Sequence, residues 1–231
     1  MIPWQSLAGL GRDLAAFALP QRCPGCGAHP GAGGLLCDAC HASVPRLASA
    51  LCVRCLAAGR EPAGCAAHPG FAAHAAWLYD PCAAAVVHAI KYQERPGLAA
   101  ALGGEMARAL PRGYRPDLVL EVPLHSARLR ERGYNQAALL AHRVADALSA
   151  PHLTGVLTRV RATRAQARLG PDERRRNLAG AFRVARPAAL SGRSVLIVDD
   201  VITTGATLEA CLTPLRAAGA RATGLALAWA Q

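Results

Sequence analysis

The chain of 231 residues suffices for one principal domain with a small appendage, and 26 basic against 15 acidic residues give it a formal net charge of +11. It contains no run of about 18 apolar residues, which argues against a membrane-spanning helix. The charge is unevenly distributed, because residues 121–190 hold 13 arginines and only 5 acidic residues, a net of +8. This clustering predicts an anionic ligand close to that segment.

An amphipathic helix is predicted at the N-terminus, within residues 1–22. Apolar residues from Leu7 to Phe17 recur at helical spacing. The pair Arg12-Asp13 interrupts the apolar run and no basic segment precedes it, so a secretion signal is not predicted. We therefore expect a cytoplasmic protein, in which the nine cysteines stay reduced.

Residues 23–70 form the next predicted unit, a double zinc-ribbon domain. Its potential ligands form four pairs with two residues between the members of each pair, and the second half repeats the first after 28 or 29 positions. Two ligands from one tight turn can occupy two corners of a tetrahedral site, so one or two structural Zn²⁺ ions are predicted. Consecutive pairs sharing an ion are the simplest arrangement, and interleaved pairs or a single occupied site are the alternatives. The predicted ligands are Cys23, Cys26, Cys37, Cys40, Cys52, Cys55, Cys65 and His68.

The zinc ions are expected to have a structural role. A module of this size has little apolar content of its own, so metal binding should provide its folding energy. All four positions of each site would be filled by protein, which leaves no open position for catalysis. Cys82 and Cys211 lie outside the repeated spacing, and we expect them to be small buried hydrophobic residues.

A buried strand is predicted over residues 117–122, where the apolar run ends at Pro123. Arg128 and Arg132 follow it, at the start of a helix that continues through Leu148. A planar guanidinium donates paired N–H bonds to phosphate oxygens, so these arginines are candidate phosphate ligands. The alternative is a solvated arginine face on the helix.

The C-terminal part contains a strand, a loop and a helix that together predict an anion site. Val195–Val198 should form a buried strand that ends in Asp199-Asp200, and the Thr/Gly-rich loop through Thr207 leads into a helix. That helix should kink at Pro214 and stop at Gly219. Backbone N–H groups at a helix N-terminus bind phosphate, and two nearby carboxylates suit diol hydroxyls or a divalent cation. A sugar phosphate is therefore the predicted ligand.

The thirteen residues VLIVDDVITTGAT, at 195–207, closely resemble the motif that binds phosphoribosyl pyrophosphate (PRPP) in type I phosphoribosyltransferases. The resemblance implies an α/β fold with a parallel sheet and flanking helices over residues 71–231, preceded by the small zinc-ribbon domain. It also implies that Mg²⁺ accompanies PRPP, that Asp199 and Asp200 hold the ribose 2′ and 3′ hydroxyls, and that the loop holds the 5′-phosphate. The loop residues are Thr203, Thr204, Gly205, Ala206 and Thr207.

The order of motifs along the chain resembles the ComF/GntX family of competence-associated phosphoribosyltransferase-like proteins. The cysteine-rich region is followed by the segments 88–92, 128–136 and 159–177, and then by the PRPP motif. One departure is His68, where many relatives would have cysteine.

The family resemblance also implies roles for basic residues. Arg128 and Arg132 would receive the pyrophosphate. Apart from the resemblance, Lys91 is the only lysine of the chain, and its compact ammonium is a candidate phosphate ligand, with a chance position as the alternative. Residues 159–177 would carry a loop that closes over the substrate and excludes water. The alternative for these seven arginines is a solvated segment that attracts nucleic acid.

Two functions follow from these motifs. The first is an enzyme that transfers the phosphoribosyl group of Mg²⁺-PRPP to a nitrogen nucleophile, linked to DNA uptake and natural competence; its acceptor and its general base are not identified. The second is a non-catalytic PRPP sensor, or an accessory protein that handles single-stranded DNA together with competence-machinery proteins. Zinc ribbons and the +8 segment favour DNA binding, whereas the 4 Tyr, 3 Trp and 3 Phe leave few platforms on which bases could stack.

Overall fold

The computed structural model describes residues 22–30, 36–56, 65–92, 97–161 and 170–231. The helix predicted within residues 1–22 therefore lies outside the described residues, except for Arg22 at its end. The main sheet has five strands in the order β1-β2-β7-β6-β3, of which β1 alone is antiparallel to its neighbour. Its strands are β1 (Leu51–Cys52), β2 (Ala72–Leu78), β3 (Leu118–Glu121), β6 (Ser194–Ile202) and β7 (Arg221–Trp229).

Both predicted buried strands are present. The strand predicted over residues 117–122 is β3, and the strand predicted over Val195–Val198 is β6, which continues to Ile202. Asp199 and Asp200 are therefore the sixth and seventh residues of a strand rather than the first residues after it. Strands of a parallel sheet are covered on both faces, which explains why their sequences are almost continuously apolar.

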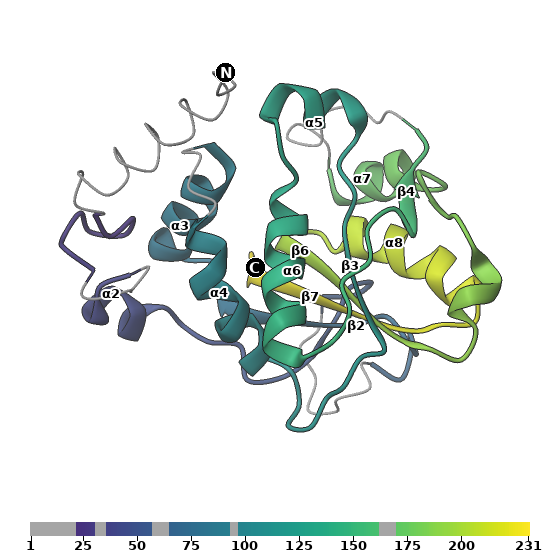
Figure 1. Cartoon of the computed structure of the whole chain (residues 1–231), viewed down its shortest axis with the longest axis horizontal. Coiled ribbons are helices and arrows are strands. Elements are labelled where there is room, and N and C mark those ends of the chain that lie inside the picture. The colour runs from purple at the N-terminus through teal and green to yellow at the C-terminus, as the bar shows by residue number, and fades with distance from the viewer. Residues whose placement is uncertain (1–21, 31–35, 57–64, 93–96, 162–169) are drawn as a thin grey trace, which may run out of the picture.

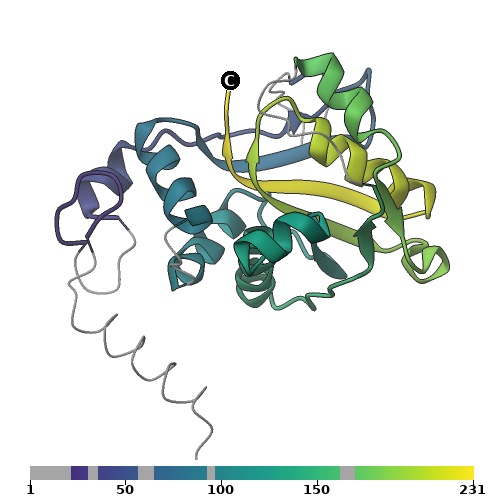
Figure 2. The same cartoon turned by 90° about the horizontal axis from the view of Figure 1, so that it is seen from above.

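Helices cover the two faces of the sheet (Figure 2). On one face lie α3 (Pro81–Tyr92), α4 (Gly97–Arg108) and α6 (Gln136–Leu148), which share a hydrophobic core with alternate residues of the strands. On the other face lie α7 (Pro171–Leu178) and α8 (Ala206–Ala217), and a second core joins them to the sheet. The sheet is therefore sandwiched between two helical layers, as expected for an α/β fold.

The helix predicted after the Thr/Gly-rich loop is α8, and it runs through Pro214 to Ala217 without a break. Gly219 follows it with a left-handed φ of 81°, where the helix was expected to stop. The expected face is buried, since Leu208, Cys211 and Leu212 lie within the second core.

The arginine-rich segment 159–177 is more regular than a loop in its described part. Arg159 ends β4 (Leu157–Arg159), which pairs with β5 (Phe182–Val184) in a separate two-stranded sheet. Gly170 and Pro171 begin α7 because proline is favoured in the first helical turn and the carboxylate of Glu173 accepts the N–H of Gly170 at 3.0 Å. The central part of the predicted closing loop, at 162–169, lies outside the described residues.

Three short elements complete the fold: α2 (Asp38–Ser43), α5 (Ser126–Arg132) and a 3₁₀-helix, η2 (Pro187–Leu190). In Figure 1, α2 lies at the left of the molecule, whereas α7 and α8 lie at the right. Within the part of the chain that the structure describes, no helix is long and apolar enough to cross a membrane.

Candidate functional site

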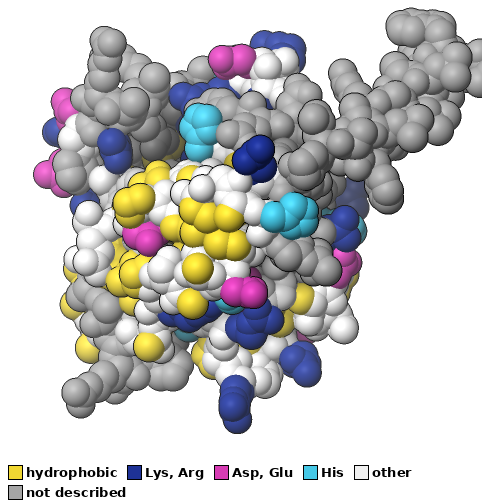
Figure 3. All heavy atoms as spheres, turned by 90° about the vertical axis from the view of Figure 1, so that its left-hand side faces the viewer, with side chains coloured by type: hydrophobic (Ala, Val, Ile, Leu, Met, Phe, Trp, Pro, Cys, Tyr) yellow, Lys and Arg dark blue, Asp and Glu magenta, His cyan; other side chains and the backbone are white. Residues whose placement is uncertain are grey.

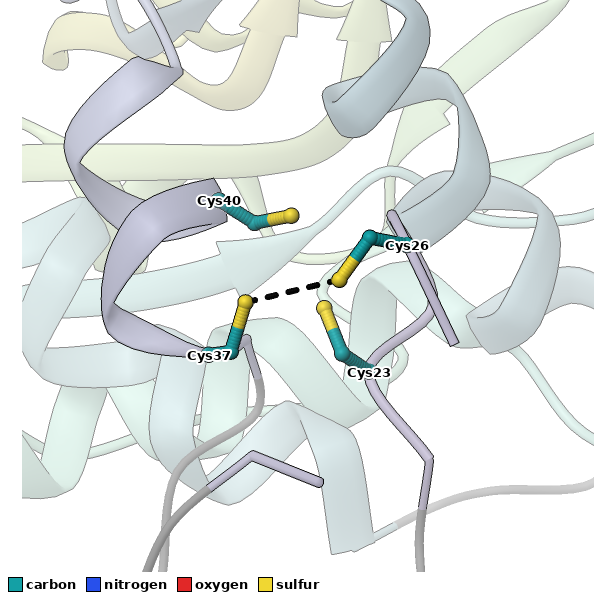
Figure 4. A group of neighbouring side chains, drawn as sticks. All are labelled: Cys23, Cys26, Cys37 and Cys40. Carbon is teal, nitrogen blue, oxygen red and sulfur yellow. Dashed lines mark hydrogen bonds between the residues drawn. The ribbon is translucent and has the colours of Figure 1, made fainter. Parts of the chain in front are cut away.

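The eight predicted metal ligands form two separate groups of four, in consecutive order along the chain. Cys23, Cys26, Cys37 and Cys40 make the first metal group, and Cys52, Cys55, Cys65 and His68 make the second; the ligand atoms within each group lie within 4.8 Å of one another. Figure 4 shows the four sulfur atoms of the first group converging from one turn and from the start of α2.

Individual distances fit zinc. Sγ atoms are 3.5 Å apart for Cys26 and Cys37 and 3.7 Å apart for Cys55 and Cys65. The Nδ1 atom of His68 lies 3.3 Å from Sγ of Cys65, so His68 joins its group despite standing where a cysteine was expected. Zn–S bonds of about 2.3 Å in a tetrahedron would separate two sulfurs by about 3.8 Å. The donor set and its spacing therefore suit two structural Zn²⁺ ions.

The first metal group is attached to the face that carries α3 and α4. Its Cys23 lies in the first hydrophobic core, together with Leu36 and Val44. Cys82, predicted to be a buried hydrophobic residue, is only half-buried beside this group, with its Sγ 4.0 Å from the carbonyl oxygen of Cys40. Cys211 lies on the buried face of α8 and is fully buried, as predicted.

A buried carboxylate joins the first metal group to α4. Glu105 is only 4% exposed, accepts a hydrogen bond from the indole N–H of Trp77 at 3.1 Å, and pairs with Arg46 and Arg108. His41, next to the ligand Cys40, lies 3.5 Å from the same carboxylate. Three basic partners and a buried indole satisfy a charge that would otherwise be costly to bury.

On the surface beyond this group, hydrophobic side chains gather in the middle of the visible face, and Lys and Arg side chains are scattered around them (Figure 3). This face is the left-hand side of Figure 1, where α2 and α3 lie. The arginine-rich residues 121–190 belong to other elements. The described residues around the first metal group therefore contribute little to the net positive charge of the protein.

At the carboxyl end of β6, Asp200 is the centre of a hydrogen-bonded chain that joins three predicted site residues through Gln136, which was not predicted. Its Oδ2 accepts from Nε2 of Gln136 at 2.9 Å and lies 3.1 Å from Nζ of Lys91. Arg132 in turn donates to Oε1 of Gln136 at 2.5 Å. An acid, an ammonium, an amide and a guanidinium from four different elements thus meet at one edge of the sheet.

The residues 134–136 explain why these groups meet. The hydroxyl of Tyr134 donates to the carbonyl of Ile90, next to Lys91, which ties this segment to α3. Asn135 caps α6, with its Oδ1 accepting the N–H of Ala137 at 3.1 Å, and its Nδ2 donates to the carbonyl of Val122 at 3.1 Å. The first residue of α6 is then Gln136, which reaches Asp200.

Asp199 points into the opposite face of the sheet, toward α8 and β4. Burial, and then the neighbouring charge of Asp200, raise the pKa of Asp199 to about 7, while Lys91 and Arg159 favour its ionised form. Its Oδ1 accepts the N–H of Asp200 at 2.8 Å. A divalent cation or the hydroxyls of a bound diol would compensate this pair of buried carboxylates.

The predicted phosphate loop lies between β6 and α8. Gly205 caps α8 with a left-handed φ of 72°, and Ala206 is the first residue of the helix, so free N–H groups point from the helix N-terminus. Arg174 donates to Oγ1 of Thr203 at 3.3 Å, and Arg175 donates to the carbonyl of Thr204 at 3.4 Å. Thr203 is exposed, and Thr207 is half-buried in the first turn of α8.

Two further arginines, Arg128 and Arg159, are basic residues of the region around Asp199 and Asp200. Arg128 is exposed on α5, where no described contact holds it to Asp200. Arg159 lies over the ring of Phe182, with 5.5 Å between its Cζ and the ring centroid. Burial lowers the pKa of Arg159, and the charge of Arg128 lowers it further, whereas Asp199 raises it.

Some polar contacts of this region could not be predicted from the sequence pattern. Gln136 stands in a motif but has no titrating or nucleophilic group that would single it out. Arg175 and Glu209 pair at 3.2 Å across α7 and α8, and a cavity of about 490 Å³ lies beside them, lined also by Phe182 and Ala206. At the end of β3, Oε2 of Glu121 lies 2.8 Å from Nε2 of His152.

Comparisons with known proteins agree with the two-part organisation. A family described as "Double zinc ribbon domain" matches residues 14–68, and a family described as "Phosphoribosyl transferase domain" matches residues 134–231. The parallel sheet with helices on both faces and the preceding zinc ribbon confirm the predicted fold class.

Several curated proteins are similar to part of the chain. "DNA utilization protein YhgH" of Salmonella typhi is 38% identical over 136 residues, 56% of this chain and 59% of that protein. "Competence protein F" of Haemophilus influenzae is 41% identical over 105 residues, 45% of this chain and 46% of that protein. "Adenine phosphoribosyltransferase" of Rhodococcus opacus is 55% identical over 38 residues, 16% of this chain and 22% of that protein. The chain thus spans about half of the length of the first two relatives.

Among solved structures, the glutamine PRPP amidotransferase of B. subtilis, complexed with ADP and GMP, is similar with a TM-score of 0.40 and 23% identity. The similarity covers 59% of this chain and 29% of that chain.

Proposed function

We propose that the chain is a ComF-family protein and that it binds Mg²⁺-PRPP at the carboxyl end of β6. The family is supported by a double zinc-ribbon match that precedes a phosphoribosyltransferase match, and by the relatives named for competence and DNA utilization. The observation that carries the proposal is the contact of Asp200 with Lys91 and, through Gln136, with Arg132. This arrangement brings hydroxyl-binding carboxylates and phosphate-binding cations together beside a helix N-terminus. PRPP carries the hydroxyls and the phosphates that such side chains bind, all on one ribose.

Each part of PRPP has a counterpart in the proposed complex. Asp199 and Asp200 accept the ribose 2′ and 3′ hydroxyls, and the loop 203–207 binds the 5′-phosphate through its N–H groups and hydroxyls. Lys91, Arg128 and Arg132 bind the pyrophosphate. When bound, Mg²⁺ neutralises pyrophosphate charge, and the two carboxylates are the hard oxygen donors that this cation prefers.

In the transferase version of this proposal, a nitrogen nucleophile displaces pyrophosphate from C1′ of the ribose. Arg132 and Lys91 hold the departing pyrophosphate, while Asp199 and Asp200 keep the ribose in place. The protein then contributes positioning and electrostatic stabilisation rather than a nucleophile of its own.

The relatives named for competence and DNA utilization support a link to DNA uptake. The reduced cysteines of two zinc groups support a cytoplasmic location.

Calorimetric titration with Mg²⁺-PRPP tests the site. We expect Asp199→Asn/Asp200→Asn to weaken binding by about 100-fold, because two charge-assisted hydrogen bonds to the ribose are lost. Asp146→Asn is the matched control, since Asp146 is an exposed acid of α6 that pairs only with nearby surface groups in the described contacts. Equal affinity of the double variant and the control would refute the assignment.

A second candidate is the non-catalytic sensor or DNA-handling protein, favoured by the net charge of +8 in residues 121–190. Release of pyrophosphate with any member of a panel of nucleobases would establish the transferase, whereas tight PRPP binding without release would favour the sensor.

Direct binding of single-stranded DNA is tested by its dependence on salt. Arg183 and Arg186 are exposed residues of the basic segment, and their replacement by Ala should lower the salt slope by about 1.4 if both contact phosphates. Arg221→Ala, an exposed arginine outside this segment, is the control and should leave the slope unchanged.

A further inference from the structure

The second metal group is packed against the phosphate loop, and we infer that its zinc ion holds this loop in its binding conformation. The inference rests on the proposed binding of PRPP, but it concerns a different set of residues: the turn between the ligands Cys52 and Cys55. The first metal group makes no such contact in the described part of the chain, because it lies on α3 and α4.

The closest contact is between Val53 and Gly205. Val53 follows the ligand Cys52 and is fully buried in the second core. Its carbonyl oxygen lies so close to Gly205 that a Cβ atom at position 205 would collide with it. Gly205 also has a φ of 72°, which side-chain-bearing residues rarely adopt. The loop therefore turns over the backbone of the metal-binding turn.

Side chains strengthen this contact from both sides. Arg54, inside the same turn, pairs with Oε1 of Glu209 at 2.8 Å. Glu209 belongs to the first turn of α8, and its N–H donates to the carbonyl of Gly205 at 2.9 Å. Arg175 donates to the carbonyl of Arg54 at 2.5 Å and to the carbonyl of Thr204 at 3.4 Å. One guanidinium therefore binds the metal turn and the phosphate loop at once.

The other end of the second metal group is fixed as well. Val53 N–H donates to the carbonyl of Phe71 at 2.9 Å, and the guanidinium of Arg54 stacks over the Phe71 ring at 4.0 Å. Arg216, at the far end of α8, donates to the carbonyl of Gly70 at 3.2 Å. The segment that follows the ligand His68 thus contacts both the metal-binding turn and the last turn of α8.

Zinc would add a further restraint to the turn, beside the contacts of Val53 and Arg54 described above. Leu56 closes it with a positive φ of 56° and a single hydrogen bond from its N–H to the carbonyl of Cys52 at 2.7 Å. Four ligands from residues 52–68 converge on one point, so bound zinc joins the turn to the segment before β2. Without zinc, the turn would lose one of the restraints that keep Val53 against Gly205, and part of the free energy of phosphate binding would then be spent on ordering the loop.

The experiment compares two matched ligand variants, Cys55→Ser and Cys26→Ser. Each residue is the second cysteine of its pair and each is exposed. Each variant should retain one of two zinc equivalents. Hydrogen exchange of the amides of residues 203–207 is measured without PRPP, and we expect it to accelerate at least about tenfold in Cys55→Ser only. Equal acceleration in both variants, or none in either, would overturn the inference.

Calorimetry with Mg²⁺-PRPP is the second readout. We expect the dissociation constant to rise about tenfold in Cys55→Ser and to stay within about twofold of the wild type in Cys26→Ser. If the wild type does not bind PRPP, the proposed function fails, while the exchange data still decide whether the metal holds the loop. If the wild type binds and both variants bind equally well, the inference fails alone.

If Cys55→Ser does not fold, the variant Arg54→Ala tests instead whether the metal-binding turn holds the phosphate loop. This change removes the pair with Glu209 and the stacking on Phe71 but keeps all eight metal ligands. Both zinc equivalents should remain, and loop exchange should accelerate about threefold. The control is Arg46→Ala, which removes an arginine that pairs with Glu105 on the side of the first metal group. Unchanged loop exchange in Arg54→Ala would overturn the inference.

Discussion

The two metal groups have similar ligand spacing but opposite positions in the fold. The first lies on the face of the sheet that carries α3 and α4, and Glu105 holds it there. The second adds β1 to the edge of the sheet and packs on α8, on the other face. A repeated sequence motif has therefore acquired two different surroundings, and the surroundings, not the ligands, determine what each zinc ion can influence.

The largest expected difference is in the free energy of unfolding after loss of a buried ligand. Cys23 and Cys52 are both buried first ligands, but only Cys52 lies in a strand of the main sheet. We expect Cys52→Ser to cost about 4 kcal/mol and Cys23→Ser about 2 kcal/mol, because the former also frees Leu51 and Val53 from the core. Urea unfolding of the zinc-loaded proteins measures both. Equal costs would mean that the two groups support the fold alike.

A pair of glycine substitutions sharpens the comparison. Gly205 and Gly27 have left-handed φ angles of 72° and 76°, and Gly27 lies beside the first metal group. A Cβ atom at 27 meets nothing within 4 Å, whereas one at 205 collides with Val53. We expect Gly27→Ala to cost about 1 kcal/mol and Gly205→Ala about 3 kcal/mol. Thermal unfolding checks this; similar losses would show that the Val53 contact relaxes easily.

Carboxylates on the two faces should differ in what their removal affects. Glu105→Gln should destabilise the protein by about 2 kcal/mol, since Arg46 and Arg108 lose a buried partner, without changing PRPP affinity. Glu209 is more exposed, so Glu209→Gln should cost only about 1 kcal/mol but weaken PRPP binding several-fold. Urea unfolding and calorimetry with Mg²⁺-PRPP on both variants provide the measurement. A loss of PRPP affinity in Glu105→Gln would contradict the expectation that only the carboxylate beside α8 affects binding.

The smallest expected effect concerns pH. Because burial and Asp200 raise the pKa of Asp199 to about 7, the native state holds this proton over a range in which the unfolded state has released it. Stability should therefore fall as pH rises from about 4 to about 7. We expect Asp199→Asn to be more stable than the wild type by about 1 kcal/mol at pH 8, roughly 2–4 °C in Tm, with no gain at pH 4. A constant difference across this range would contradict the raised pKa.

Local sequence patterns predicted the helices, strands and loops that are formed by one continuous stretch of residues. The run Val195–Val198 with Asp199-Asp200 and the Thr/Gly-rich loop gave β6, the loop and α8, because period and turn chemistry act over short distances. Likewise, the two-residue spacing anticipated four ligand pairs.

Long-range partners could not be predicted in this way. The link from Lys91 through Asp200 and Gln136 to Arg132 joins α3, β6, α6 and α5, and no local pattern encodes which of these meet. The division of the zinc ribbon between two faces depends on β1 pairing with β2, a consequence of topology. The family resemblance implied a closing loop over residues 159–177, with a solvated arginine segment as the alternative. Residues 171–178 instead form α7, because Gly170 and Glu173 cap a helix there.

The position of β7 has a consequence for how the chain acquires its structure. This strand follows all the other described strands in the sequence, yet it lies between β2 and β6, and Ala73 pairs with Gly224 across about 150 residues. Contacts so distant in sequence form slowly, because the intervening chain must first be brought together. During synthesis β2 can bind β1 and the zinc turn early, but its other edge stays open until β7 is made. Cys52–Cys55 can thus collect its metal long before the loop that it supports exists.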